Sequence, residues 1–246
     1  MARQYTAALA AATRESRHPR SSREQKAAGG EYEAVLLFDV HAVGKGKAAY
    51  NSCMRQVCVF CGSSSGSRPE YRAATEELGA ELVRRNIGLV YGGGKVGLMG
   101  VLADSVLRAG GRAVGVIPED LLAREIGHND LTKLHVVGSM HQRKALMADL
   151  ADAFIALPGG FGTLEEFFEI LTWAQLGLHA KACGILNVGG YYSPLLAMLD
   201  HAVRERFLKV ENRELILARD SVAQILEALE NWRPLQVEKW LDREAT

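Results

Sequence analysis

The chain has 246 residues, 48% of them hydrophobic, and its 29 Lys and Arg residues balance 29 Asp and Glu residues. This length is enough for one large α/β domain with a substantial core, and the balanced charge argues against a nucleic-acid partner with a broad binding surface. No apolar run approaches the roughly 18 residues of a membrane span, so no membrane partner is expected, and the few cysteines form no disulfide framework, which indicates a reducing compartment.

Residues 1–53 differ from the rest of the chain. Residues 2–28 contain six Arg and Lys residues against two Glu residues, with several serines between them. Such a leader is typical of an organelle transit peptide, but a disordered extension, or a true start at Met54, is the preferred interpretation. We therefore expect a cytoplasmic protein, with the nucleus as a second compartment and organelle import through residues 1–28 as the alternative.

From Arg55 onward, buried apolar runs alternate with amphipathic runs. The apolar runs predict strands at 56–61, 87–91, 112–117, 133–137, 153–157, 182–188 and 215–218. The amphipathic runs predict helices at 70–85, 96–108, 140–149, 164–178, 192–206 and 221–231. This alternation predicts one three-layer Rossmann-like domain over 54–231, in which helices cover both faces of a parallel sheet of about seven strands. Residues 120–130 are expected to form a polar loop, and residues 232–246 a polar C-terminal tail with Trp232 and Trp240 as docking points.

Three loops of small residues follow three of the predicted strands. They are Cys61-Gly62-Ser63-Ser64, Gly92-Gly93-Gly94 and Pro158-Gly159-Gly160. In a parallel sheet these loops share the carboxyl edge, where ligands bind, and glycine lets the backbone approach a ligand closely. The three loops together therefore predict a nucleotide site. The spacing Gly92-x-Gly94-x-x-Gly97 also fits a dinucleotide motif, but a third glycine loop and a nearby pair of glutamates are not part of that mechanism.

The segment Pro158–Glu166 has the most informative sequence. It joins a buried strand to a helix through glycines, so free backbone N–H groups and the positive end of a helix dipole should form an anion site. Two carboxylates, Glu165 and Glu166, lie in the first turn of the predicted helix. A pure phosphate site would repel them, whereas a site that binds phosphate and also performs chemistry can use one.

A basic pair, Arg143-Lys144, lies where the helix after the fourth strand begins. Next to an anion site these side chains can reach a phosphate or neutralise a carboxylate. The neighbouring His141 is expected to be structural, since no second ligand lies at metal spacing. Cys58 and Cys61 are expected to be buried, reduced thiols, because the motif lacks the context of a metal or redox site.

These motifs, together with Gly115-Val116-Ile117-Pro118 and Met140-His141-Gln142-Arg143-Lys144, resemble the Lonely Guy (LOG) family, specifically its plant-type branch. The resemblance covers about residues 55–230. It implies a hydrolase that cuts the N-glycosidic bond of N6-substituted adenosine 5′-monophosphates and releases a free cytokinin base and ribose 5-phosphate. It also implies a homodimer or larger homo-oligomer, and neither a cofactor nor a metal.

The resemblance also implies roles for individual residues. Arg143 and Glu166 match the catalytic pair. The candidate substrate- and phosphate-binding residues are Ser63, Gly93, Gly94, Met99, Glu125, Lys144, Gly159, Gly160, Phe161, Gly162, Thr163, Leu164, Glu165 and Thr172.

Two other functions remain open from the sequence. A non-catalytic nucleotide carrier or sensor could share the fold, although an intact Arg143 and Glu166 argue against it. An amino-acid decarboxylase, the former label of the family, would need a lysine that forms a Schiff base with pyridoxal phosphate. Lys95 and Lys144 lie in the right region, but no partner arrangement for the pyridinium nitrogen is evident.

Overall fold

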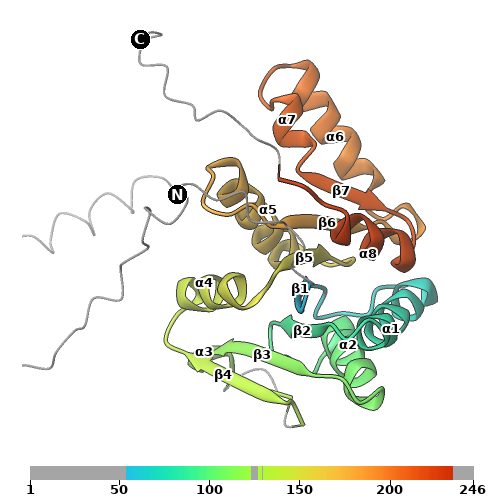
Figure 1. The fold of residues 1–246 in the computed structure, drawn as a ribbon, viewed down its shortest axis with the longest axis vertical. Helices are drawn as coiled ribbons and strands as arrows, with labels where there is room; N and C mark the ends of the chain where they lie inside the picture. Colours follow the sequence, from blue (N-terminus) through green and yellow to red (C-terminus); the bar gives the residue numbers. More distant parts are fainter. Residues whose placement is uncertain (1–53, 123–126, 129, 235–246) are drawn as a thin grey trace, which may run out of the picture. The chain divides into compact units, whose positions relative to one another are not determined.

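A computed structural model of the chain describes residues 54–122, 127, 128 and 130–234 (Figure 1). The predicted extension 1–53, the candidate site residue Glu125 and the docking residue Trp240 therefore lie outside the described residues.

The centre of the fold is a seven-stranded, entirely parallel sheet in the order β4-β3-β2-β1-β5-β6-β7 (Figure 1). The strands are β1 (Gln56–Phe60), β2 (Gly88–Tyr91), β3 (Ala113–Pro118), β4 (Lys133–Val137), β5 (Ala153–Ala156), β6 (Ala182–Leu186) and β7 (Ile216–Arg219). The chain builds outward from β1 in one direction, then returns to place β5 on its other side. The strand order thus reverses between β1 and β5, which is where ligands bind in open α/β sheets.

Helices cover both faces of the sheet, as predicted. The helices are α1 (Pro69–Arg84), α2 (Gly97–Arg108), α3 (Glu119–Leu122), α4 (Met140–Leu150), α5 (Phe161–Gln175), α6 (Ser193–Arg204), α7 (Val210–Arg213) and α8 (Val222–Glu230), with a 3-10 turn η1 (Val188–Gly190). None of the helices in the described ranges is long and apolar enough to cross a membrane.

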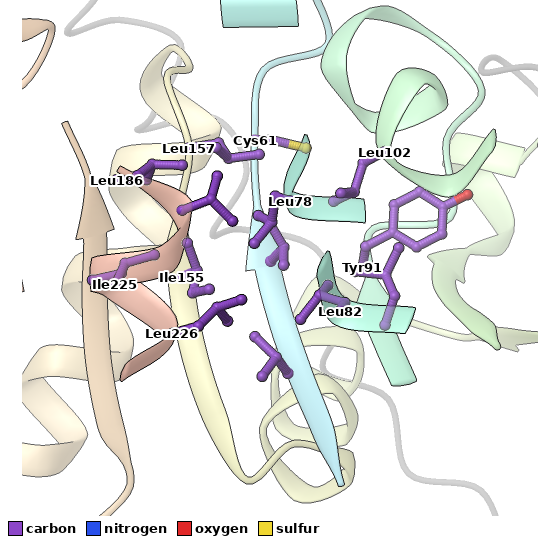
Figure 2. Packing of buried hydrophobic residues seen from close by; sticks show 14 of the residues in the cluster. Cys61, Leu78, Leu82, Tyr91, Leu102, Ile155, Leu157, Leu186, Ile225 and Leu226 are labelled. Carbon is purple, nitrogen blue, oxygen red and sulfur yellow. The ribbon is translucent and has the colours of Figure 1, made fainter. Parts of the chain in front are cut away.

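Successive side chains of the strands point into two separate cores. Val57 and Val59 of β1 face a core shared with α1, α2 and α8. Cys58 and Phe60 face the opposite core, which α4 and α5 help to fill. Figure 2 shows part of the first core, where Leu78, Leu102 and Leu226 approach the sheet from three helices. The inner strands, such as β2 and β5, are buried on both faces, so their sequences are continuously apolar rather than alternating, whereas the edge strands β4 and β7 are partly exposed.

Four details differ from the sequence-based prediction. Helix α5 begins at Phe161 rather than at residue 164, so the predicted turn is shorter and its last residues are helical. The expected polar loop at 120–130 contains the end of the short helix α3 and a fully buried histidine, His128. Strand β6 ends at Leu186, before the turn η1, and the short helix α7 was not predicted.

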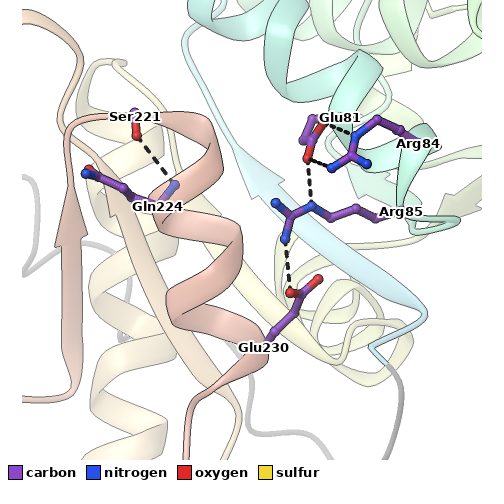
Figure 3. A network of polar contacts seen from close by, with 6 residues as sticks. All are labelled: Glu81, Arg84, Arg85, Ser221, Gln224 and Glu230. Atoms are coloured by element: carbon purple, nitrogen blue, oxygen red, sulfur yellow. Dashed lines mark hydrogen bonds and ion pairs between the residues drawn. The ribbon is translucent and has the colours of Figure 1, made fainter.

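Polar contacts join α1 to α8 at the edge of the first core (Figure 3). Arg85, the C-cap residue of α1, pairs with Glu81 of α1 at 2.8 Å and with Glu230 of α8 at 3.0 Å. Hydrogen bonds from Arg84 and Arg85 lower the pKa of Glu81 to about 2. Ser221 is the N-cap of α8: its hydroxyl oxygen accepts a hydrogen bond from the Gln224 N–H.

The start of the predicted tail docks as expected. The Trp232 indole N–H donates a hydrogen bond to the Ala180 carbonyl at 3.3 Å, and its ring packs against the first core.

Candidate active site

Three small-residue loops meet at the carboxyl edge of the sheet, next to the boundary between β1 and β5. The Gly62 N–H, after β1, donates to the Pro158 carbonyl after β5 at 3.1 Å. The Leu98 N–H, after β2, donates to the Gly62 carbonyl at 3.0 Å. The contact between the first two loops is also close at Gly97, where a Cβ atom would overlap the Ser63 carbonyl group. The structure thus brings together the three loops that the sequence placed at one edge.

The loop after β5 leads directly into the N-terminus of α5. Gly160 is the N-cap residue, and its carbonyl accepts the first hydrogen bond of the helix from the Leu164 N–H. The N–H groups of Phe161, Gly162 and Thr163 precede that bond, so they are the donors that a helix start leaves for an anion. A Cβ atom at Gly160 or Gly162 would meet nothing within 4 Å, so the space beside the loop is open.

Arg143 of α4 and Glu166 of α5 meet in a buried position beside this helix start. Their side chains lie 2.8 Å apart, Nη1 to Oε1, and the two residues are 9% and 8% exposed. The contact is a buried ion pair. A hydrogen bond from Arg143 Nε to the Val116 carbonyl, at 3.0 Å, fixes the guanidinium on β3. Helix α5 therefore presents one carboxylate, and α4 presents the cation that faces it.

The charge state of Glu166 is set by opposing influences. Burial raises the pKa of its carboxyl, the Arg143 charge lowers it, and the neighbouring Glu165 charge raises it again. The net direction is upward, because removal from water is the largest influence on this pKa. A glutamate with a raised pKa beside a candidate ligand site is typical of functional carboxylates.

Lys144 contacts carboxylates in the structure. Its ammonium lies 2.5 Å from Glu165 Oε1 and 2.9 Å from Glu169 Oε2. Burial alone would lower the pKa of Lys144, but its pairing with the two carboxylates raises it. Helices α4 and α5 are thus joined by two adjacent sets of ion pairs, Arg143 with Glu166 and Lys144 with two glutamates.

Gly92, at the end of β2, packs against the guanidinium of Arg143. A Cβ atom at Gly92 would overlap Arg143 Nη2 and would lie 3.4 Å from the Met99 sulfur. A side chain at residue 92 would therefore displace the Arg143 guanidinium from its present position, and the predicted site residue Met99 lies next to the same position.

The remaining predicted site residues occupy different positions. Gly93 has a φ of +78°, which glycine adopts without strain, and its carbonyl accepts a hydrogen bond from the His128 N–H. Gly94 forms an isolated antiparallel bridge with Gly127. Phe161 is 93% exposed at the helix start, while Leu164 packs in part against the second core. Thr172 lies further along α5, and its hydroxyl donates to the Phe168 carbonyl at 2.8 Å.

Three neighbouring residues, His141, Cys58 and Cys61, were predicted to have no direct role in the chemistry. His141 is exposed on the first turn of α4. Cys58 and Cys61 are buried and unbridged, as predicted, and burial is the main cause that raises the pKa of both thiols.

Sequence reasoning missed two groups that support the loops. His128 is 2% exposed and its Nε2 lies 2.8 Å from Asp104 Oδ1 of α2, while its own N–H binds Gly93. Tyr191 and Tyr192, after η1, donate hydrogen bonds to carbonyls of the loop after β5. The only sequence signal for the second group is the short run Gly189-Gly190-Tyr191-Tyr192 after a buried strand.

The parallel sheet with helices on both faces defines an α/β protein with a Rossmann-like fold, and the three converging loops, the helix start and the buried Arg–Glu pair form its candidate ligand site. Residues 99–229 match the family model described as "Possible lysine decarboxylase". The chain belongs to the Lonely Guy (LOG) family, whose curated plant members are named cytokinin riboside 5′-monophosphate phosphoribohydrolases.

Two of the curated relatives show how far the match extends. One from Oryza sativa subsp. japonica, named "Probable cytokinin riboside 5′-monophosphate phosphoribohydrolase", is 50% identical over 199 residues, which cover 81% of this chain and 80% of the relative. A cytokinin riboside 5′-monophosphate phosphoribohydrolase from Arabidopsis thaliana is 50% identical over 183 residues, which cover 74% of this chain and 86% of the relative.

Solved structures share the fold at much lower identity. The molybdenum cofactor carrier protein of Chlamydomonas reinhardtii matches with a TM-score of 0.54 and 19% identity, over 72% of this chain and 96% of that one. The molybdenum cofactor binding protein of the bacterium Rippkaea orientalis matches with a TM-score of 0.55 and 19% identity, over 72% and 95% of the two chains. At this identity the likeness concerns the fold alone.

Proposed function

We propose that this protein hydrolyses the N-glycosidic bond of N6-substituted adenosine 5′-monophosphates and releases the free cytokinin base and ribose 5-phosphate. The observation that carries this proposal is the buried Arg143–Glu166 pair, 2.8 Å apart, beside the open N-terminus of α5. It occurs in a chain 50% identical to relatives named for this reaction.

The reaction breaks the bond between ribose C1′ and the base nitrogen, and a water oxygen forms the new bond to C1′. Positive charge builds on the ribose as the base leaves, as in sugar hydrolysis generally. The ionised Glu166 carboxylate stabilises that charge or activates the water, which gives up a proton as the base gains one. Arg143 opposes the effect of burial on Glu166 and so favours its ionised form.

The substrate's 5′-phosphate would bind at the start of α5. Gly159, Gly160, Gly162 and Thr163 surround this position, and the N–H groups of the helix start suit a phosphate. Binding there would hold the ribose next to Glu166, and this fixed orientation would increase the rate of the reaction. Lys144 is already paired with Glu165 and Glu169. Its positive charge would therefore act on the phosphate from the edge of the site rather than through a direct contact.

Pyridoxal phosphate chemistry does not fit the residues at this site. A lysine that forms a Schiff base must lose its proton readily, and enzymes achieve this by lowering its pKa. The pKa of Lys144 is instead raised by its two glutamate partners, and Lys95 is exposed to solvent. The decarboxylase label of the family model therefore has no support from these side chains.

The proposal is tested by product chromatography with three substrates side by side: isopentenyladenosine 5′-monophosphate, AMP and isopentenyladenosine. We expect release of the free base from the isopentenyl monophosphate and far slower cleavage of the unphosphorylated riboside. Equal rates for riboside and monophosphate would contradict phosphate anchoring. Binding of the monophosphate without product release would instead make the protein a carrier.

We further propose a homodimer or larger homo-oligomer that acts in the cytoplasm. Large exposed apolar side chains at both ends of α5 support a contact between copies: Phe161 at its start, and Leu176 and Leu178 just after its end. Sedimentation of the purified protein tests the assembly, and a monomer at micromolar concentration would contradict it.

A further inference from the structure

Three consecutive carbonyls of the loop after β5 are each held by a hydrogen bond. Leu157 O accepts from the Tyr192 hydroxyl at 2.7 Å, and Gly159 O accepts from the Tyr191 hydroxyl at 2.6 Å. Between them, Pro158 O accepts from the Gly62 N–H. All three carbonyls of the loop that leads into α5 are therefore held in place. Two of the three hydrogen-bond donors are the hydroxyls of adjacent tyrosines.

We propose that Tyr191 is a positioning residue for the phosphate-binding loop, because its hydroxyl sets the orientation of the Gly159–Gly160 peptide. A trans peptide points its C=O and N–H in opposite directions. The bond from Tyr191 to Gly159 O thus directs the Gly160 N–H away from Tyr191, and Gly160 directly precedes the residues whose N–H groups the helix start leaves free. This inference rests on the proposed function, since it assigns Tyr191 to the same phosphate position.

The loop needs such a restraint because its own residues provide little. Gly159 and Gly160 have no side chains, and a Cβ atom at Gly160 would meet nothing within 4 Å. Glycine backbones sample more conformations than those of other residues, so an unrestrained Gly-Gly peptide can rotate. A ligand that has to order this peptide when it binds would bind more weakly, because the ordering costs conformational entropy.

Tyr191 is itself held in a defined place. Its ring meets those of Tyr192 and Tyr71 edge to face, at centroid distances of 4.9 and 5.7 Å. The Tyr192 N–H donates to Asn187 Oδ1 at 2.7 Å, and the Asn187 amide donates in turn to Asp220 at 3.1 Å. The hydroxyl of Tyr191 is therefore held in position by the packing of its ring against two other tyrosines.

Because Tyr191 is partly exposed, its role in orienting the loop can be measured separately from any role in stability. Tyr191 is 40% exposed and Gly159 is partly exposed, so water can replace the lost hydroxyl after substitution. The variant Tyr191→Phe keeps the ring and removes only the donor. We expect it to fold normally, with a melting temperature within about 3 °C of the wild type, because one exposed hydrogen bond contributes little to stability.

The test compares the wild type, Tyr191→Phe and Tyr71→Phe. The last variant removes a hydroxyl from the neighbouring ring but not from the loop. We expect Tyr191→Phe to raise the Kd for ribose 5-phosphate about fivefold, and the KM for isopentenyladenosine 5′-monophosphate similarly, which is the effect one hydrogen bond supports. The Kd for adenine and the behaviour of Tyr71→Phe should stay near the wild type.

The outcomes distinguish this inference from the proposed function. An unchanged Kd for ribose 5-phosphate in Tyr191→Phe, or an equal rise in the Kd for adenine, overturns the role of Tyr191 alone. A lower melting temperature with an unchanged Kd for ribose 5-phosphate would show that Tyr191 has only a structural role. If the wild type binds no ribose 5-phosphate and cleaves no nucleotide, the proposed function fails, and the role of Tyr191 fails with it.

Discussion

At the scale of single residues, the two adjacent glutamates of α5 differ in their surroundings. Glu166 is buried against Arg143, whereas the Glu165 side chain is 54% exposed and pairs with Lys144. Because α5 begins at Phe161, both lie in its second turn rather than in the first turn that the sequence predicted, so the helix dipole has little influence on either. Only Glu166 faces the buried cation, so the chemistry is expected to depend on it alone.

Glu166→Gln should fold and lose nearly all turnover, by at least about 100-fold in kcat, because the amide cannot carry the negative charge. Arg143→Ala should lose turnover as well, and an effect on KM alone would make Arg143 a binding residue only. Steady-state kinetics on isopentenyladenosine 5′-monophosphate measure both. The matched control is Glu165→Gln, whose kcat should remain near the wild type. Wild-type activity in Glu166→Gln would contradict the assignment.

The pH profile follows from the direction of the shift at Glu166. Its pKa is raised above the usual glutamate value of about 4.3, so the active carboxylate is lost by protonation at a higher pH than for an exposed glutamate. The acid limb of kcat/KM should therefore lie above that value. Glu165→Gln removes a charge that raises this pKa, so it should move the limb to lower pH. A limb that moves upward in this variant would contradict the electrostatic account.

At the scale of elements, the site depends on how closely β2 approaches α4. Gly92→Ala would place a methyl group into the position of Arg143 Nη2 and so displace the guanidinium. We expect kcat to fall at least about tenfold, since misplaced catalytic groups cost rate steeply. Gly88→Ala, at the other end of β2, is the control: its nearest contact would be an ordinary 3.5 Å. Equal kinetics in the two variants would show that the position of Arg143 does not matter.

The elements themselves were largely predictable from the sequence. The buried inner strands are short apolar runs, such as 153–157, and three of them lead into small-residue loops; this pattern is typical of strands covered on both faces. The start of α5 was misplaced because glycine in a first turn resembles a loop. The buried position of His128 was missed for another reason: its partner, Asp104, lies 24 residues away and leaves no local pattern.

The candidate site was predictable in outline rather than in detail. Loops after parallel strands must share an edge, so the meeting of the three glycine loops followed from the fold class. The pairing of Lys144 with two glutamates and the hydrogen bond from Tyr191 to Gly159 did not. Both depend on side-chain contacts across 21 or more residues, which spacing alone does not specify.

At the scale of the whole molecule, stability should come from the two cores far more than from surface ion pairs. Leu226→Ala removes a fully buried side chain of α8 (Figure 2) and should destabilise the fold by about 2–5 kcal/mol. Glu230→Gln breaks the ion pair to Arg85 (Figure 3) and should cost about 1 kcal/mol or less, because Glu230 is 41% exposed. Denaturant unfolding measures both, and a larger loss from Glu230→Gln would contradict this ranking.

The pairing of β1 with β5 has a consequence for how the protein folds. Val57 lies opposite Ala153, and Asp152 accepts hydrogen bonds from the backbone of Arg55 and Gln56, so residues almost a hundred positions apart must meet. Closing a loop of that length carries a large entropy cost before any contact offsets it, and parallel pairings of this kind form slowly. Because the site lies across this pair of strands, the helices can form early while the site is still incomplete. Recovery of catalytic activity during refolding should therefore lag behind recovery of helical signal.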